Sequence, residues 1–202
     1  MAKLYYRYGT MNSGKSFDIL KIANNYEEQG KKVLIFTSVV DTRHGIGKVT
    51  SRVGFQREAL LMDERMMEVV EQGTPDCVVV DEAQFASTKQ IDQLAEIVDC
   101  LDIPVIVYGL MTDFQGIMFE GSKRLLEIAD RIEEIKTVCW YCNRKARFNT
   151  RFKDGQAVFT GEQLDIGGND KYQPLCRKCY MKEKVKSEQA NLQKLEEAKL
   201  DN

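Results

Sequence analysis

The chain alternates short apolar runs with longer stretches in which apolar residues recur every three or four positions. The apolar runs predict strands at Leu4 to Tyr8, Val33 to Phe36, Val78 to Val80 and Val105 to Leu110. The recurring patterns predict helices at Ser16 to Gln29, Glu64 to Gln72, Thr88 to Asp99 and Ser122 to Ile132. Ser122 is the expected N-cap of the last helix. Strands that alternate with helices predict an α/β fold with a parallel sheet.

The alternation ends near residue 137. Up to residue 176 the chain carries glycines and short polar segments without a helical period, which predicts a small β-rich unit or a long loop held by something other than a core. From Met181 to Asn202 the chain is rich in Lys, Glu and Gln and predicts a solvated helix. We therefore expect an α/β domain at 1–136, a smaller domain at 137–182 and a charged tail at 183–202.

Composition excludes several classes of protein. Of the 202 residues, 43% are hydrophobic and 30% charged, so a real core can form. The 29 Lys and Arg residues against 31 Asp and Glu residues argue against broad electrostatic binding of nucleic acid. No apolar run approaches the roughly 18 residues of a membrane span, and the first residues lack the pattern of a signal peptide. We expect a cytoplasmic chain that binds neither membranes nor nucleic acid.

A glycine-rich segment between the first predicted strand and the first predicted helix fits the pattern G-x-x-x-x-G-K-[ST]. Its residues are Gly9, Thr10, Met11, Asn12, Ser13, Gly14, Lys15 and Ser16. Such a loop turns successive backbone N–H groups toward phosphate oxygens, and the following helix adds the positive end of its dipole. Lys15 would reach the β- and γ-phosphates and Ser16 would bind Mg²⁺. The segment predicts a P-loop nucleotide-binding fold; a chance glycine turn before a helix is the alternative.

Two acidic residues follow the apolar strand Val78 to Val80. Asp81 is expected to hold Mg²⁺ through water, as P-loop proteins require of an acid at a neighbouring strand end. Glu82 could accept a proton from an attacking group. Water as that group would make an ATPase, and a substrate hydroxyl would make a kinase. Alternatively, Glu82 is a surface acid at a strand end.

Four of the six cysteines form two C-x-x-C pairs separated by 33 residues: Cys139, Cys142, Cys176 and Cys179. Zn²⁺ binds four thiolates tetrahedrally without an open position, so the pattern predicts a structural zinc site. Disulfides are one alternative. Another is a zinc module that binds nucleic acid, suggested by nearby Arg144, Lys145, Arg147, Arg151 and Lys153. The other two cysteines, Cys77 and Cys100, lie beside apolar runs and are predicted to be core residues.

The order and spacing of these motifs resemble the type II thymidine kinase family of bacterial and vertebrate cytosolic enzymes. The resemblance runs from Lys3 to about Tyr180. Besides the cysteine pairs, it rests on Met11 to Ser16, Asp41-Thr42-Arg43, Asp81 to Phe85, Tyr108-Gly109-Leu110, Asp113-Phe114-Gln115, Phe119 to Ser122 and Ile166 to Tyr172. It implies transfer of the ATP γ-phosphoryl group to the 5′-hydroxyl of thymidine or deoxyuridine, with Glu82 as general base.

The resemblance also implies the rest of the site. Asp41, Arg43 and Gln84 join the P-loop and Asp81 in binding ATP and Mg²⁺. The segment between the cysteine pairs is the family's lasso, anchored by structural zinc. Residues expected to bind the nucleoside are Met11, Phe85, Leu110, Phe114, Phe119, Asn149, Asp165, Ile166, Gly167 and Tyr172. Family members are typically homotetramers inhibited by thymidine triphosphate.

Other interpretations stay open for some of these residues. Leu110, Phe114 and Phe119 could instead pack in the core. Thr10 stands where the family often has proline, and Asn149 stands where relatives carry another small polar residue. Two other functions also remain: a nucleic-acid-stimulated ATPase, because Asp-Glu-Ala-Gln after a strand also suits helicase-type motors, and a zinc-bearing binding module with an idle nucleotide site.

Overall fold

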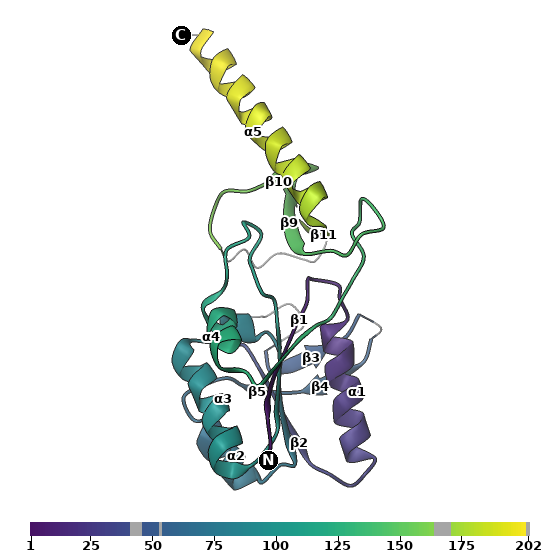
Figure 1. Ribbon diagram of the computed structural model, residues 1–202, viewed down its shortest axis with the longest axis vertical. Coiled ribbons are helices and arrows are strands. Elements are labelled where there is room, and N and C mark those ends of the chain that lie inside the picture. Colours follow the sequence, from purple (N-terminus) through teal and green to yellow (C-terminus); the bar gives the residue numbers. More distant parts are fainter. Residues whose placement is uncertain (41–45, 53, 164–170, 201–202) are drawn as a thin grey trace.

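A six-stranded parallel sheet organises the first two thirds of the chain (Figure 1). The computed structural model describes residues 1–40, 46–52, 54–163 and 171–200. Across the sheet the strands follow the order β5 (Leu60–Leu61), β2 (Val33–Thr37), β6 (Cys77–Val80), β7 (Val105–Gly109), β1 (Leu4–Tyr8) and β8 (Arg131–Glu134). All neighbouring pairs are parallel, which confirms the predicted α/β sheet.

Helices cover both faces of this sheet (Figure 1). On one face lies α1 (Lys15–Glu27), beside the antiparallel pair β3 (Lys48–Thr50) and β4 (Gln56–Glu58). On the other face lie α2 (Met66–Gly73), α3 (Thr88–Leu101), α4 (Glu120–Ile128) and the short 3₁₀ helix η1 (Ala83–Phe85). The sheet therefore has an apolar core on each side, as the continuous apolar strands predicted.

The packing of α1 shows how the sequence pattern produces this layer. Ile19, Leu20 and Ala23 are buried and lie on one face of the helix, as positions three and four apart must. They pack against the sheet residues Val79 and Ile106 in the same apolar cluster. Burying an aliphatic side chain of the size of Ile19 or Leu20 stabilises a fold by about 1.5–3 kcal/mol.

The predicted helix from Ser122 to Ile132 is wrong at both ends. The helix α4 begins at Glu120 and ends at Ile128, and Arg131 to Glu134 forms the edge strand β8. Three of the four residues of β8 are exposed, so burial imposed no alternating pattern on the sequence. Ser122 is not the N-cap; it lies inside the helix, fully buried, and its hydroxyl donates to Leu110 O at 2.5 Å.

Of the two cysteines predicted to be core residues, one is exposed. Cys77 is completely buried at the start of β6. Cys100 is exposed near the end of α3, because the buried stripe of that helix comprises Ile91, Leu94, Ile97 and Val98. The apolar neighbours of Cys100 along the chain therefore misled the prediction.

The second part of the chain builds a small antiparallel sheet. Its strands are β9 (Phe148–Lys153), flanked by β10 (Gln156–Val158) and β11 (Tyr172–Leu175). This sheet confirms the predicted β-rich unit. Helix α5 (Arg177–Leu200) follows and projects away from the rest of the molecule (Figure 1). It confirms the predicted solvated helix and is continuous across residue 182. The expected division into two domains and a tail, with boundaries after residues 136 and 182, stays a prediction.

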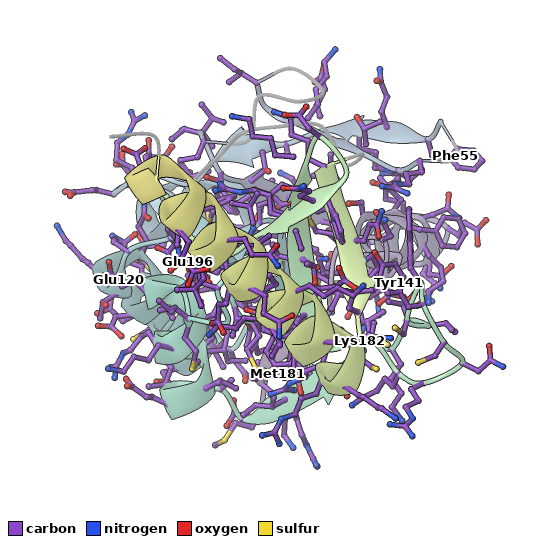
Figure 2. The ribbon with its side chains drawn as sticks, turned by 90° about the horizontal axis from the view of Figure 1, so that it is seen from above. Phe55, Glu120, Tyr141, Met181, Lys182 and Glu196 are labelled. Carbon is purple, nitrogen blue, oxygen red and sulfur yellow. The ribbon has the colours of Figure 1, made fainter. Side chains whose placement is uncertain are left out.

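Figure 2 shows Met181 and Lys182 at one end of α5 and Glu196 toward the other. Among the helices and strands that the structure describes, those of the small sheet make the most extensive contact with α5. Within the described part of the chain, none of the helices is both long and apolar enough to span a membrane.

Candidate active site and cysteine cluster

The glycine-rich loop connects the end of β1 to the start of α1. Its first N–H group, that of Gly9, donates to Gly109 O in the neighbouring strand β7 at 3.2 Å. A Cβ at Gly9 would collide with the side chain of Ser13 and lie 2.7 Å from Ile135 O. Gly14 has φ +88°, a left-handed conformation that glycine adopts without steric cost. Both glycines of the motif are therefore required by the shape of the loop.

Lys15 lies beneath the loop, where only 8% of its surface is exposed. Its ammonium group donates to Gly9 O at 3.3 Å and to Thr10 O at 3.0 Å. The buried side-chain oxygens of Thr10, Asn12 and Ser13 have no hydrogen-bond partner among the described residues. Buried polar atoms are rarely left unsatisfied, so a loop with three of them suits a polar ligand.

The two acids at the end of β6 lie next to the start of α1. The hydroxyl of Ser16 donates to the buried Asp81 carboxylate at 3.4 Å. The backbone N–H of Glu82 donates to the other oxygen of Asp81 at 2.9 Å. Glu82 itself has φ +53°, a strained conformation for a non-glycine residue and one that clusters at functional sites. A hydroxyl and a carboxylate this close fit the oxygen ligands that Mg²⁺ prefers.

Gln84 connects Glu82 to the end of β7. It is 2% exposed; its carboxamide NH₂ donates to the Glu82 carboxylate and its carbonyl accepts from Leu110 N at 3.0 Å. The amide thus holds the carboxylate of the expected general base. The contact of Gln84 with ATP stays a prediction.

The described residues expected around the nucleoside make several separate contacts. Phe85 and Phe119 meet edge to face with ring centres 5.7 Å apart. The N–H of Met11 donates to the side-chain carbonyl of Asn149 at 2.7 Å, joining the P-loop to β9.

Phe114 is 2% exposed, and the guanidinium of Arg151 lies 3.9 Å from the centre of its ring. Tyr172, 8% exposed, is the cross-strand partner of Arg151. Leu110, directly after β7, accepts the Ser122 hydroxyl through its carbonyl. Asp41, Arg43, Asp165, Ile166 and Gly167, which were also expected in the site, lie outside the described residues.

Asp113 has a structural role that the sequence motifs did not predict. Its buried carboxylate accepts the N–H groups of Gln115 and Ile117, each at 2.9 Å, and the Gln163 side chain at 3.0 Å. These bonds fold the turn that contains Gly116, at φ +84°, between Phe114 and Phe119. An Asp three residues before a Gly is a turn signal that could have revealed this role.

The four cysteines of the two C-x-x-C pairs converge. Their Sγ atoms all lie within 4.8 Å of one another. Cys142 Sγ lies 3.7 Å from Cys176 Sγ and 3.8 Å from Cys179 Sγ, far longer than the roughly 2.05 Å of a disulfide. All four are free cysteines, so the disulfide alternative is wrong. The cluster is compatible with zinc.

The pKa values in this cluster move in opposite directions. Burial would raise the pKa of the Cys139 thiol, but the N–H groups of Cys176, Tyr141 and Cys142 lower it to about 7. The pKa of Cys179 rises to about 12, because desolvation and the neighbouring thiols disfavour another negative charge. A cation among the sulfurs removes that conflict, since metal-bound thiols are deprotonated.

The fold and the site together define a P-loop nucleotide-binding protein with a separate four-cysteine cluster. A family model described as "Thymidine kinase" matches residues 2–180. A thymidine kinase of Lactococcus lactis is 54% identical over 189 residues, covering 92% of this chain and 100% of the relative. A thymidine kinase of Lactiplantibacillus plantarum is 54% identical over 184 residues, covering 89% of this chain and 96% of the relative. The chain belongs to the thymidine kinase family.

Among solved structures, AMPPCP-bound DnaA from Aquifex aeolicus covers 67% of this chain at 17% identity, with a TM-score of 0.39. The chain covers 41% of that protein. A likeness of this size carries no inference about function.

Proposed function

We propose that this chain transfers the γ-phosphoryl group of ATP to the 5′-hydroxyl of thymidine, and also of deoxyuridine, to give the monophosphate. One observation carries the proposal: in a member of the thymidine kinase family, Glu82 follows the Asp81 carboxylate, which accepts a hydrogen bond from Ser16 of the P-loop. A carboxylate beside the phosphate site suits an acceptor with a hydroxyl group.

In the proposed reaction, Glu82 accepts the proton of the 5′-hydroxyl. The freed oxygen bonds to the γ-phosphorus while the bond to the bridging oxygen breaks, and ADP leaves. Lys15 and the loop N–H groups neutralise the charge that spreads over the phosphate oxygens. Ser16 and Asp81 would hold Mg²⁺, which supplies further charge neutralisation when bound. Asp41, Arg43 and Gln84 complete this proposed ATP site.

The nucleoside is proposed to lie between the P-loop and the small sheet. Met11, Phe85, Leu110, Phe114 and Phe119 would surround the flat base, as apolar and aromatic side chains do in most small-molecule sites. Asn149, Asp165, Ile166, Gly167 and Tyr172 would close over it. In support, Asn149 already bonds Met11, so the small sheet and the loop meet there.

Zinc is proposed to hold the base of the small sheet through Cys139, Cys142, Cys176 and Cys179. Four thiolates leave no open position, so the ion would supply folding energy rather than catalysis. A homotetramer and inhibition by thymidine triphosphate follow from family resemblance alone. Both stay predictions, as does the cytoplasmic location.

The direct test is incubation of purified, zinc-loaded protein with Mg²⁺, ATP and thymidine, with chromatographic detection of thymidine monophosphate. Deoxyuridine serves as a second acceptor, and DNA without nucleoside tests the ATPase alternative. We expect monophosphate from both nucleosides and no DNA-stimulated hydrolysis. Absence of thymidine monophosphate, or hydrolysis that rises with DNA alone, would overturn the proposal.

A further inference from the structure

The end of β7 contacts the start of the phosphate loop and the first turn of the helix that follows it. Gly109 O accepts the N–H of Gly9, where the loop begins. The preceding residue, Tyr108, donates its hydroxyl to the carboxylate of Asp18, in the first turn of α1, at 2.7 Å. Two consecutive residues of one strand therefore fix the loop at its start and just beyond its end. The proposed function gives no role to Tyr108 or Asp18.

A third residue closes the arrangement around the Tyr108 hydroxyl. Arg7 of β1 donates to Tyr108 Oη at 3.0 Å and to Asp18 Oδ2 at 3.1 Å. Tyr108 is completely buried, while the Arg7 and Asp18 side chains are 24% and 21% exposed. Lys21 on α1 and Glu133 on β8 flank the group and pair with Asp18 and Arg7 respectively. Hydrogen bonds between charged groups at this depth are stronger than neutral ones.

The position of Asp18 makes these bonds relevant to the loop. Its N–H donates to Gly14 O at 3.0 Å, which closes the first helical turn. Lys15 and Ser16 belong to that turn, so a shift of Asp18 relative to the sheet moves both. Displacements of about 1 Å in such a site are enough to cost large factors in rate or affinity.

We propose that Tyr108, Asp18 and Arg7 form a positioning group that locks the first turn of α1 to the sheet and so sets the ATP-binding geometry of the phosphate loop. The inference rests on the proposed function in that it takes the loop to bind ATP. None of the three residues touches the nucleotide. Their effect passes through Gly14, Lys15 and Ser16.

The primary test is Tyr108→Phe, which removes one hydroxyl and keeps the ring in the core. Titration calorimetry with Mg²⁺ and a non-hydrolysable ATP analogue should show affinity lower by roughly five- to tenfold, the size of one hydrogen bond to a charged group. The KM for thymidine should change by less than about twofold, because the aromatic residues of the nucleoside site keep their places. Asp18→Asn, which keeps the shape of the side chain, should act in the same direction.

The matched control is Tyr26→Phe. Tyr26 lies in the last turns of the same helix, with its hydroxyl near Cys77 of β6. This substitution also removes a hydroxyl between α1 and the sheet, but far from the loop, and should leave ATP affinity unchanged. Thermal unfolding of each variant separates a change in affinity from a change in stability.

A double-mutant cycle decides whether the group acts as a unit. The combined Tyr108→Phe, Asp18→Asn variant should bind the analogue no more than about twofold more weakly than the weaker single variant. The reason is that Tyr108→Phe removes, and Asp18→Asn weakens by removing the charge, the same hydrogen bond. Unchanged affinity in Tyr108→Phe, equal losses in Tyr108→Phe and Tyr26→Phe, or a combined loss equal to the product of the single losses would each overturn the inference. If the unaltered protein binds no ATP analogue, the proposed function fails instead.

Discussion

The two parts of the molecule are stabilised in different ways. The parallel sheet has a large apolar cluster on each face, and the four residues of β6 are completely buried. In the small sheet, the buried cluster comprises Leu175, Tyr180, Cys139 and Cys176, with Phe148 stacked on Tyr180 at 4.3 Å. Half of those four buried residues are cysteines of the metal-compatible cluster.

This difference predicts which part of the fold would depend on a metal. Apolar burial at the scale of the parallel sheet offsets the conformational entropy of its own chain. The small sheet lacks that area, and a structural metal typically supplies the missing free energy. We therefore expect the parallel-sheet region, which contains the proposed phosphate site, to fold by packing. The small-sheet region, which is proposed to close over the nucleoside, is expected to fold with a bound metal.

The largest expected effect tests the chemistry without disturbing either region. Glu82→Gln should lower kcat by about 10²–10⁴-fold, because only the proton acceptor is removed. The substituted amide still accepts a hydrogen bond from Gln84, so ATP affinity and the melting temperature should stay near their original values. Steady-state kinetics with thymidine and ATP titration measure both. Unaltered turnover in this variant would contradict the assignment of the base.

Removing one cysteine sulfur should affect the small-sheet region and leave the parallel-sheet region intact. Cys176→Ser should abolish stoichiometric zinc binding and lower thymidine affinity by at least about tenfold, because the small sheet loses its anchor. ATP-analogue affinity should change little. Metal analysis and the two titrations measure this. Cys100→Ser is the matched control: that thiol is exposed on α3 and should change none of these quantities. If Cys176→Ser lowers the affinities for thymidine and for the ATP analogue equally, the two regions fold as one unit.

Truncating one buried leucine in each region tests whether the two regions are stabilised in different ways. Leu94 and Leu175 are both completely buried. Leu94→Ala should lower the free energy of unfolding of the parallel-sheet region by about 2–5 kcal/mol, without changing zinc affinity. Leu175→Ala should instead weaken zinc binding by about tenfold or more, because folding of the small sheet and metal binding are linked. Denaturation with urea and competition with a zinc chelator distinguish these outcomes; the reverse pattern would refute the metal dependence.

The smallest effect concerns pH. Burial alone would raise the pKa of Asp18, but hydrogen bonds from Lys21 and Tyr108 and the charge of Arg7 lower it below its usual 3.8. Asp18 therefore stabilises the fold above about pH 4, and this contribution is lost as pH falls through its folded-state pKa. In Asp18→Asn, the free energy of unfolding measured with urea should depend less steeply on pH between about pH 5 and pH 3. If the stability of the variant and that of the unaltered protein depend on pH in the same way, Asp18 does not contribute to this dependence.

Much of the phosphate site could be predicted because its determinants are local. The spacing of Gly9, Gly14 and Lys15 defines the loop within eight residues, and the strand before Asp81 defines the end of the sheet where it lies. The four-cysteine cluster could also be predicted, because the preference of zinc for four thiolates does not depend on the length of chain between the two C-x-x-C pairs. The edge strand β8 was missed because an exposed strand carries no burial pattern.

The local elements follow directly from the amino-acid sequence: the glycine-dependent loop, the continuous apolar strands, the amphipathic helices and the four members of the cysteine cluster. Which distant residues meet depends on the three-dimensional packing of the chain. Met11 bonds Asn149, and Tyr108 bonds Asp18 across 90 positions of the chain. The physical reason is that propensity and periodicity act over a few residues, whereas these contacts depend on the order of strands in the sheet and on the helix packed against them.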